Sequence, residues 1–128
     1  MFKWLARQQQ GTPATDIPRV ASPEELDRLL AQDLVVFFKH SPTCGVSWAA
    51  HHQVKRFLAA HPGAPVHLIS VRQDREISRR IAEITGIPHA SPQILVMRQG
   101  EAIADTSHEG ITADNLSGMF ASASGARS

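Results

Sequence analysis

The chain contains one cysteine, Cys44, and the position of this residue determines which chemistry the sequence can support. A lone thiol forms no intramolecular disulfide, so disulfide-stapled scaffolds and cysteine-rich zinc sites are excluded. Cys44 follows the apolar run Leu34–Phe38 and precedes apolar residues at helical spacing, which predicts a strand-to-helix junction. Helix N-termini stabilise anions, and cysteines there have pKa values of about 3.5–7.5 rather than about 8.5. We therefore interpret Cys44 as a reactive thiolate, not as a small buried apolar residue.

Four neighbours of Cys44 are expected to support this chemistry. Lys39 and His40 lie just upstream and would add positive charge, although a histidine that only packs at a strand end is the open alternative for His40. Thr43 belongs to the loop that carries the thiol. Gly45 would let the backbone turn tightly and leave the sulfur uncovered.

Ser47 stands three residues after Cys44, where dithiol enzymes carry a second cysteine. A serine cannot attack a mixed disulfide, so a mixed disulfide formed at Cys44 must be resolved by an external thiol. The Ser47 hydroxyl either donates a hydrogen bond to the thiolate or belongs to an ordinary first-turn helix residue, and both alternatives stay open. The sequence therefore predicts a monothiol mechanism.

The elements that must position Cys44 alternate between helices and strands. Ser22 is a helix N-cap followed by proline and two glutamates, Asp74 and Thr112 are further candidate N-caps, and Gly86 is a candidate helix stop. Strands are expected at 34–38, 66–71, 93–97 and 102–106, with helices after residues 22, 45, 74 and 112. This order predicts a thioredoxin-like α/β fold, in which helices flank a central four-stranded mixed sheet.

The composition indicates one small globular domain. The chain has 128 residues, 42% of them apolar, and a formal net charge of +1. We expect a flexible N-terminal lead-in at 1–16, the thioredoxin-like domain at 17–120 and a disordered tail at 121–128. The near-neutral charge argues against a nucleic-acid partner, and the lack of a long apolar run argues against a membrane or a signal peptide. A cytoplasmic location is therefore expected.

Three motifs, in the right order, resemble the YtxJ family of monothiol bacilliredoxins. They are Phe38-Lys39-His40-Ser41-Pro42-Thr43-Cys44-Gly45-Val46-Ser47, Thr85-Gly86-Ile87 with His89-Ala90-Ser91-Pro92-Gln93, and Thr106-Ser107-His108 with Ile111-Thr112. The resemblance covers roughly residues 22 to 120. It implies a thioredoxin-like fold and a thiol-disulfide oxidoreductase that removes bacillithiol, a small thiol, from mixed disulfides on oxidised proteins. Those proteins and the small thiol would be the partners, with bacillithiol as co-substrate.

The resemblance also implies the residues that meet the substrate. Thioredoxin-like folds place a cis-proline opposite the active cysteine, which implies a cis Ser91–Pro92 peptide close to the thiol. The segment 106–108 would line the groove for the small thiol, with a plain strand-to-loop turn as the open alternative. The residues assigned to substrate and thiol binding are Ser91, Pro92, Gln93, Ser107 and His108.

An alternative function follows from Gly45, which stands where many family members carry proline. It makes Cys44-Gly45-Val46-Ser47 similar to the Cys-Gly-Phe-Ser motif of monothiol glutaredoxins. Such a protein would carry a [2Fe-2S] cluster between two chains, held by one Cys44 from each and two small thiols. The usual glutathione-binding Thr-Val-Pro and Cys-Asp-Asp segments are absent. The seven histidines lack the spacing of a zinc site, and no metal is expected.

Overall fold

The computed structural model describes residues 17–125, and the predicted flexible lead-in at 1–16 lies outside the described residues. The elements follow the predicted order. They are α2 (Pro23–Leu30), β1 (Leu34–His40), α3 (Gly45–Ala60), β2 (Val66–Ser70), α4 (Arg75–Thr85), β3 (Gln93–Arg98), β4 (Glu101–Ser107), the short 3-10 helix η1 (His108–Gly110) and α5 (Ala113–Gly125). None of these helices is long and apolar enough to cross a bilayer.

The four strands form one mixed sheet in the spatial order β2-β1-β3-β4. β1 runs parallel to β2, with His40 opposite Ser70, and antiparallel to β3, with Lys39 opposite Gln93. β4 pairs antiparallel with β3 across a tight turn. Strand β1 is therefore hydrogen-bonded along both edges. Burial of both its faces accounts for its continuous apolar sequence.

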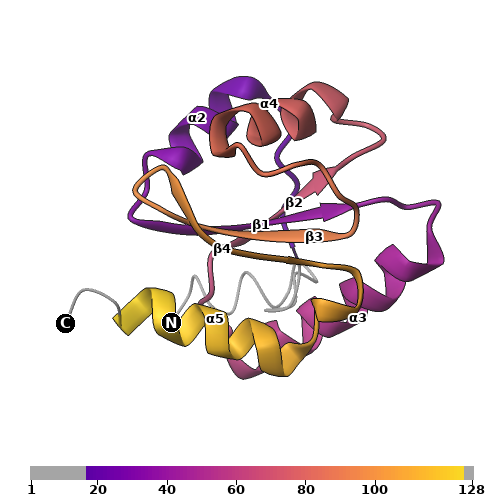
Figure 1. Ribbon diagram of the computed structural model, residues 1–128, viewed down its shortest axis with the longest axis vertical. Coiled ribbons are helices and arrows are strands. Elements are labelled where there is room, and N and C mark those ends of the chain that lie inside the picture. The colour runs from indigo at the N-terminus through magenta and orange to yellow at the C-terminus, as the bar shows by residue number, and fades with distance from the viewer. Residues whose placement is uncertain (1–16, 126–128) are drawn as a thin grey trace, which may run out of the picture.

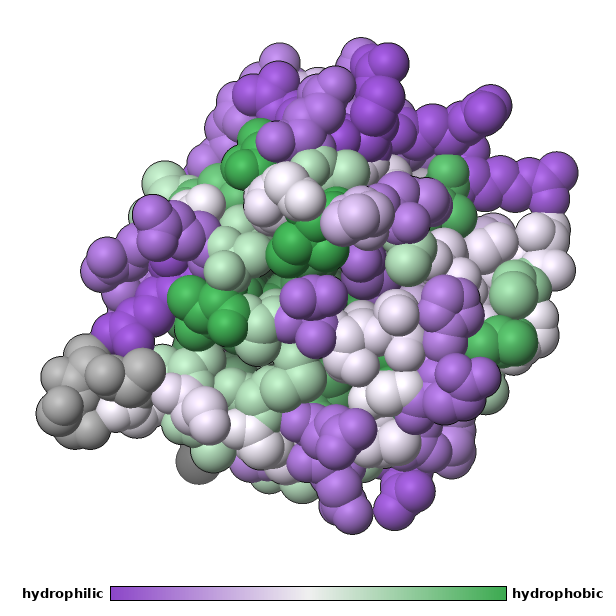
Figure 2. Space-filling view, in the orientation of Figure 1, coloured by the Kyte–Doolittle hydropathy of each residue, from purple (hydrophilic) through white to green (hydrophobic). Residues whose placement is uncertain are grey.

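Helices cover both faces of this sheet, with α2 and α4 on one side and α3 and α5 on the other (Figure 1). Alternate residues of β1 supply the two cores: Phe38 packs with α3 and α5, and Phe37 packs with α2 and α4. Figure 2 shows hydrophilic residues gathered over the α2 and α4 side, whereas hydrophobic residues reach the surface at the level of the sheet. The same alternation carries on to Lys39 and His40, so these two neighbours point to opposite faces.

Side-chain caps define two helix starts as predicted. The Ser22 hydroxyl accepts a hydrogen bond from the Glu25 N–H at 3.1 Å, and the Thr112 hydroxyl accepts one from the Asn115 N–H at 3.1 Å. Gly86 ends α4 in the left-handed conformation, with φ of 72°. These local signals are the reason that the element boundaries were readable from the sequence.

Asp74 occupies the N-cap position of α4, but its side chain makes no capping hydrogen bond. Its carboxylate instead binds Arg19, with 2.8 Å between Oδ2 and Nε. Arg19 also forms an isolated parallel bridge with Leu68 of β2. The carboxylate therefore ties the segment before α2 to the start of α4 rather than capping the helix.

The C-terminal boundary corrects the predicted disordered tail at 121–128 for residues 121–125, because helix α5 continues to Gly125. Residues 126–128 lie outside the described residues. Ala123 is only 3% exposed and packs in the core on the α3 side of the sheet. Its carbonyl accepts a hydrogen bond from Arg98 Nη1 at 3.3 Å. The small side chains of residues 121–125 show no apolar helical pattern in the sequence. These residues are helical in the structure because they contact the core and the sheet.

Replacement Ala123→Asp is expected to lower the free energy of unfolding by about 2 kcal/mol, because it would place a carboxylate among the apolar side chains of the core on the α3 side of the sheet. Ser122→Asp, at an exposed position of the same helix turn, is the matched control and should leave stability nearly unchanged. Urea denaturation measures both variants. Equal stability of the two would contradict the packing of residues 121–125.

Candidate active site

Cys44 lies at the predicted strand-to-helix junction. It is the N-cap residue of α3, four positions after the last residue of β1, and its side chain is half-buried. Its N–H donates to the Ser41 carbonyl at 3.2 Å, which closes a turn between the strand and the helix. Gly45 is the first residue of α3, and apart from its chain neighbours and the backbone of its own helix, no atom lies within 4 Å of the point that a side-chain Cβ would occupy there. The backbone therefore does not require glycine at this position, contrary to the expected tight turn.

Hydrogen bonds from the helix N-terminus lower the pKa of the Cys44 thiol below its ordinary value. The largest contribution comes from the backbone N–H of Ser47, followed by that of Val46. Burial opposes this effect, and the Ser47 hydroxyl adds a smaller lowering. The thiolate is thus stabilised by backbone dipoles, as expected for an anion at a helix N-terminus.

Ser47 is fully buried beneath the Cys44 turn. Its Oγ accepts a hydrogen bond from the Ser41 N–H at 3.2 Å. The hydroxyl hydrogen is not used in this contact, and the Ser47 side chain adds a small lowering to the pKa of the Cys44 thiol. Ser47 therefore joins the active-site loop to the first turn of α3, and its donation of a hydrogen bond to the thiolate stays a prediction.

His40 lies on the α3 face of β1 and is 4% exposed. Its ring centroid is 4.6 Å from that of Trp48 and 5.1 Å from that of His51, and neither ring nitrogen has a hydrogen-bond partner among the described residues. Burial lowers the pKa of His40, with a further lowering from His51, and the opposing effect of the Ser47 backbone is smaller. A neutral imidazole adds no positive charge at neutral pH, so the geometry favours a packing role.

Trp48 closes this aromatic cluster over the active-site loop. Its indole Nε1 donates to the Pro42 carbonyl at 2.9 Å, while its ring remains 51% exposed. In the same loop, the Ser41 hydroxyl lies 3.3 Å from Thr43 Oγ1. These contacts hold the segment between β1 and Cys44. Thr43 itself is exposed at the tip.

The Ser91–Pro92 peptide is cis, as the family resemblance implied. Gln93 pairs with Lys39 of β1, so Pro92 lies at the end of the sheet from which the active-site loop departs. The Pro92 carbonyl accepts a hydrogen bond from the His108 N–H at 3.2 Å, and Ser107 pairs with Gln93. The structure therefore brings the segments 91–93 and 107–108 together, although they are far apart in the sequence.

Comparison with known proteins identifies the family. The family model of monothiol bacilliredoxin BrxC matches residues 18–116. The chain belongs to the monothiol bacilliredoxin family. A solved structure described as a proposed oxidoreductase with a thioredoxin fold is 27% identical, has a TM-score of 0.75, and covers 80% of this chain and 91% of its own. Together these matches show a thiol-disulfide oxidoreductase.

More distant structures confirm the thioredoxin fold alone. Oxidised mitochondrial thioredoxin 3 from Saccharomyces cerevisiae is 19% identical with a TM-score of 0.66, over 83% of this chain and 94% of its own. Thioredoxin from Trypanosoma brucei brucei is 13% identical with a TM-score of 0.70, over 86% and 96%. Residues 17–125 of the bacilliredoxin hold no group of three or more His, Cys, Asp or Glu side chains that could bind a metal.

Lys39 of the bacilliredoxin is fully buried on the α4 face of the sheet, not beside His40. Its Nζ donates to the Ser78 carbonyl at 3.0 Å and lies 3.2 Å from Nδ1 of His89. Burial lowers the pKa of Lys39 to about 8. Lys39 and His40 therefore lie on opposite faces of the sheet, because neighbouring strand residues alternate, and the expected effect of the Lys39 charge on Cys44 stays a prediction. Sequence spacing gave no sign of the contacts with Ser78 and His89.

Gln93 was assigned to substrate binding, but its side chain is buried, and its Oε1 has no hydrogen-bond partner among the described residues. It is 3% exposed, and its Nε2 donates to the Pro88 carbonyl at 3.1 Å. This contact anchors the loop between α4 and β3 that ends at the cis-proline. The neighbouring Ser91 hydroxyl is buried and has no hydrogen-bond partner among the described residues.

Substitution Ser47→Ala is expected to raise the pKa of the Cys44 thiol, because one donor to the sulfur is lost. The pKa should stay below the ordinary value, since the backbone N–H groups of Ser47 and Val46 remain. The pH dependence of alkylation by iodoacetamide measures it. Ser41→Ala is the control, because it leaves the Ser41 N–H in place, and an unchanged titration in Ser47→Ala would refute the assignment.

The stability of the protein should depend on pH through His40. The pKa of His40 is lowered on folding and returns to about 6.5 in the unfolded chain. The unfolded state therefore binds more protons below pH 6.5, and stability is lost as pH falls, by at most about 1.4 kcal/mol per pH unit for one group. His40→Phe should weaken this dependence when unfolding is compared at pH 7.5 and pH 5.5. His52→Phe, at an exposed position, is the control and should leave the pH dependence of stability unchanged. A weaker pH dependence in His52→Phe but not in His40→Phe would contradict the assignment to the buried His40.

Proposed function

We propose that this bacilliredoxin removes bacillithiol, or a similar low-molecular-weight thiol, from mixed disulfides on oxidised proteins. One observation carries the proposal. The sole cysteine of the chain is the N-cap residue of α3, where the backbone N–H groups of Ser47 and Val46, with a smaller effect of the Ser47 hydroxyl, lower the pKa of its thiol. A protein built in this way has a nucleophile and no internal resolving thiol.

The proposed cycle has two thiol-disulfide exchanges. In the first, the Cys44 thiolate attacks the small-thiol sulfur of the mixed disulfide, a new Cys44–small-thiol disulfide forms, and the protein sulfur leaves as a thiolate. In the second, the thiolate of another small-thiol molecule attacks that disulfide. It forms a symmetrical small-thiol disulfide and releases the Cys44 thiolate. The external small thiol is the reductant, and Cys44 ends unchanged.

The lowered pKa of Cys44 supports the first step. Attack requires thiolate, but intrinsic nucleophilicity falls as the pKa falls, so an attacking thiol works best with a pKa near ambient pH. Burial of Cys44 opposes the amide hydrogen bonds and moderates the lowering. These opposed effects suit a thiol that must both attack and later leave.

Two exposed apolar side chains support a protein substrate. Val46 is 48% exposed and Trp48 is 51% exposed, and they stand two and four residues after Cys44. Exposed apolar groups beside a reactive thiol offer a contact surface for a partner protein. The cis-Pro92 edge, with Ser91, Ser107 and His108 beside it, would receive the substrate backbone and the small thiol. A reducing compartment such as the cytoplasm would keep both thiols reduced.

Cys44→Ala is expected to abolish release of the small thiol from a purified protein that carries a bacillithiol mixed disulfide, because the chain has no other thiol. Ser47→Ala should keep measurable activity, since Ser47 resolves nothing. Mass spectrometry follows the loss of the adduct and detects the small thiol on Cys44. Full activity without Cys44 would end the proposal.

Anaerobic reconstitution with iron and sulfide separates this function from cluster transport. The proposal expects a colourless protein. A stable visible spectrum that Cys44→Ala abolishes would instead favour the [2Fe-2S] carrier.

A further inference from the structure

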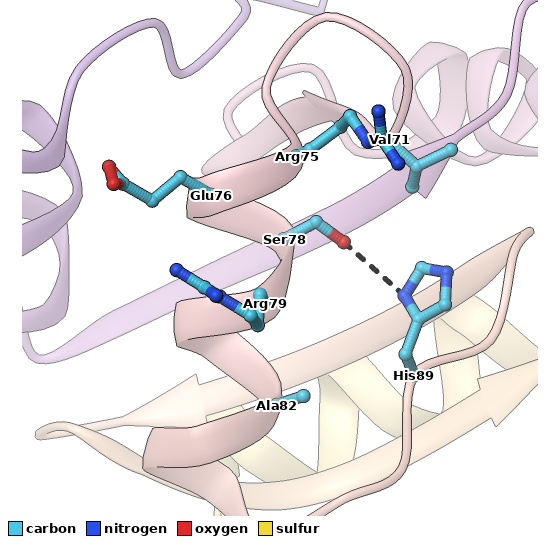
Figure 3. A pocket seen from close by; sticks show the side chains of 7 residues that line it. All are labelled: Val71, Arg75, Glu76, Ser78, Arg79, Ala82 and His89. Atoms are coloured by element: carbon cyan, nitrogen blue, oxygen red, sulfur yellow. Dashed lines mark hydrogen bonds between the residues drawn. The ribbon is translucent and has the colours of Figure 1, made fainter.

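A groove of about 550 Å³ lies between α4 and the loop that leads to the cis-proline. Arg75, Ser78 and Ala82 line it from α4, and His89 lines it from the loop (Figure 3). The Ser78 hydroxyl and Nδ1 of His89 face each other across this side of the helix at 3.3 Å. None of the residues assigned to thiol exchange at Cys44 or to the cis-proline segment lines this groove.

The buried ammonium of Lys39 lies directly beneath the groove wall. Its two polar contacts are the Ser78 carbonyl and Nδ1 of His89, and both are neutral acceptors. No acidic side chain within the described residues pairs with it, although a buried charge is costly without a partner of opposite sign. The wall of the groove is therefore electropositive and lacks a counter-ion.

His89 turns this wall into a hydrogen-bond donor. Its Nδ1 accepts a hydrogen bond from the Lys39 ammonium. Burial and the charge of Lys39 lower the pKa of His89. In a neutral imidazole whose Nδ1 accepts, the hydrogen is on Nε2. His89 is exposed, so its Nε2–H is available to an acceptor from outside.

Arg75 supplies a full positive charge at the same groove. It is exposed and forms no ion pair among the described residues. In Figure 3 it extends on the same side of α4 as Ser78, whereas Glu76 and Arg79 extend on the other side. Glu76, the acidic residue that lines the groove, forms no ion pair with Arg75 among the described residues.

The groove opens at the end of the sheet that carries Cys44. The Val71 N–H, at the groove, donates to the His40 carbonyl at 3.0 Å. Cys44 is four positions after His40, so their Cα atoms are at most about 14 Å apart. Ligands of open α/β sheets bind at the carboxyl ends of the strands, which is this end of β1 and β2.

We propose that this groove binds the carboxylate-bearing part of the small thiol, with Arg75 and the His89 Nε2–H as direct contacts and Lys39 as the charge behind them. The inference rests on the proposed function and specifies its substrate class. Mixed disulfides of anionic small thiols are preferred over those of neutral thiols of the same size. Arg75 then acts on binding rather than on the exchange step.

The test compares two mixed disulfides of one peptide, made with mercaptosuccinate and with its dimethyl ester, which has the same skeleton without charge. Arg75→Gln should reduce kcat/KM for the mercaptosuccinate conjugate about fivefold to tenfold, the loss expected for one charge-assisted hydrogen bond at an exposed site. The change should lie mainly in KM. The dimethyl ester conjugate should be unaffected.

Arg80→Gln is the matched control, because Arg80 lies on the same helix and binds Asp27 at 3.1 Å. It should leave both conjugates unaffected. Lys39→Met should also weaken the preference for the charged conjugate, with thermal unfolding run alongside to verify folding.

The outcomes separate the two proposals. Wild-type protein that releases neither thiol, nor bacillithiol, refutes the proposed function. Wild-type protein that releases both conjugates equally well leaves the function standing and refutes the anion groove. An equal effect of Arg75→Gln on both conjugates also refutes the anion groove, because a purely structural role of Arg75 would account for that result.

Discussion

Strand β1 is hydrogen-bonded to β2 on one side and to β3 on the other, and its side chains are buried on both faces. The candidate active site is built around the end of this strand. The loop that carries Cys44 leaves from it, the cis-proline segment enters beside it through the pairing of β3, and α4 follows from β2 at the same end. A central strand held so firmly cannot shift in register without moving side chains between two cores. The rigid strand end therefore positions a thiol that sits in a loop.

The thiolate is stabilised by dipoles more than by charges. The cationic candidates nearest in the sequence are both compromised by burial: His40 has a lowered pKa, and Lys39 lies across the sheet on Ser78 and His89. The amides of α3 and the Ser47 hydroxyl act instead. Short hydrogen bonds from a fixed backbone are screened by salt less than distant surface charges are. The positive charges of Lys39 and Arg75 lie on the α4 face of the sheet, where the proposed anion groove is.

The proposed reaction uses both sides of this end of the sheet. In this proposal, the exposed Val46 and Trp48 of α3 would offer apolar contacts for the protein that leaves. The groove beside α4 would offer Arg75 and His89 for the small thiol that stays on Cys44. A mixed disulfide has two dissimilar halves, and a site that is apolar on one side and electropositive on the other would direct the attack to one of its two sulfurs. Such a division matters most for a protein with a single cysteine, because no second thiol can correct an attack on the wrong sulfur.

Local patterns in the sequence were enough for the element order, the junction at Cys44, the caps at Ser22 and Thr112, and the need for an external thiol. Each depends on residues within a few positions of one another, and the helical and strand periods make such patterns readable. The partners of Lys39 and Asp74 were not readable, since they lie 39 to 55 residues away and are chosen by packing. The same holds for residues 121–125, whose small side chains carry no apolar signal until β3 and the core cover them. One cysteine and one serine decide that the chemistry is monothiol, whereas the tertiary structure decides which charges meet the thiol and which are kept from it.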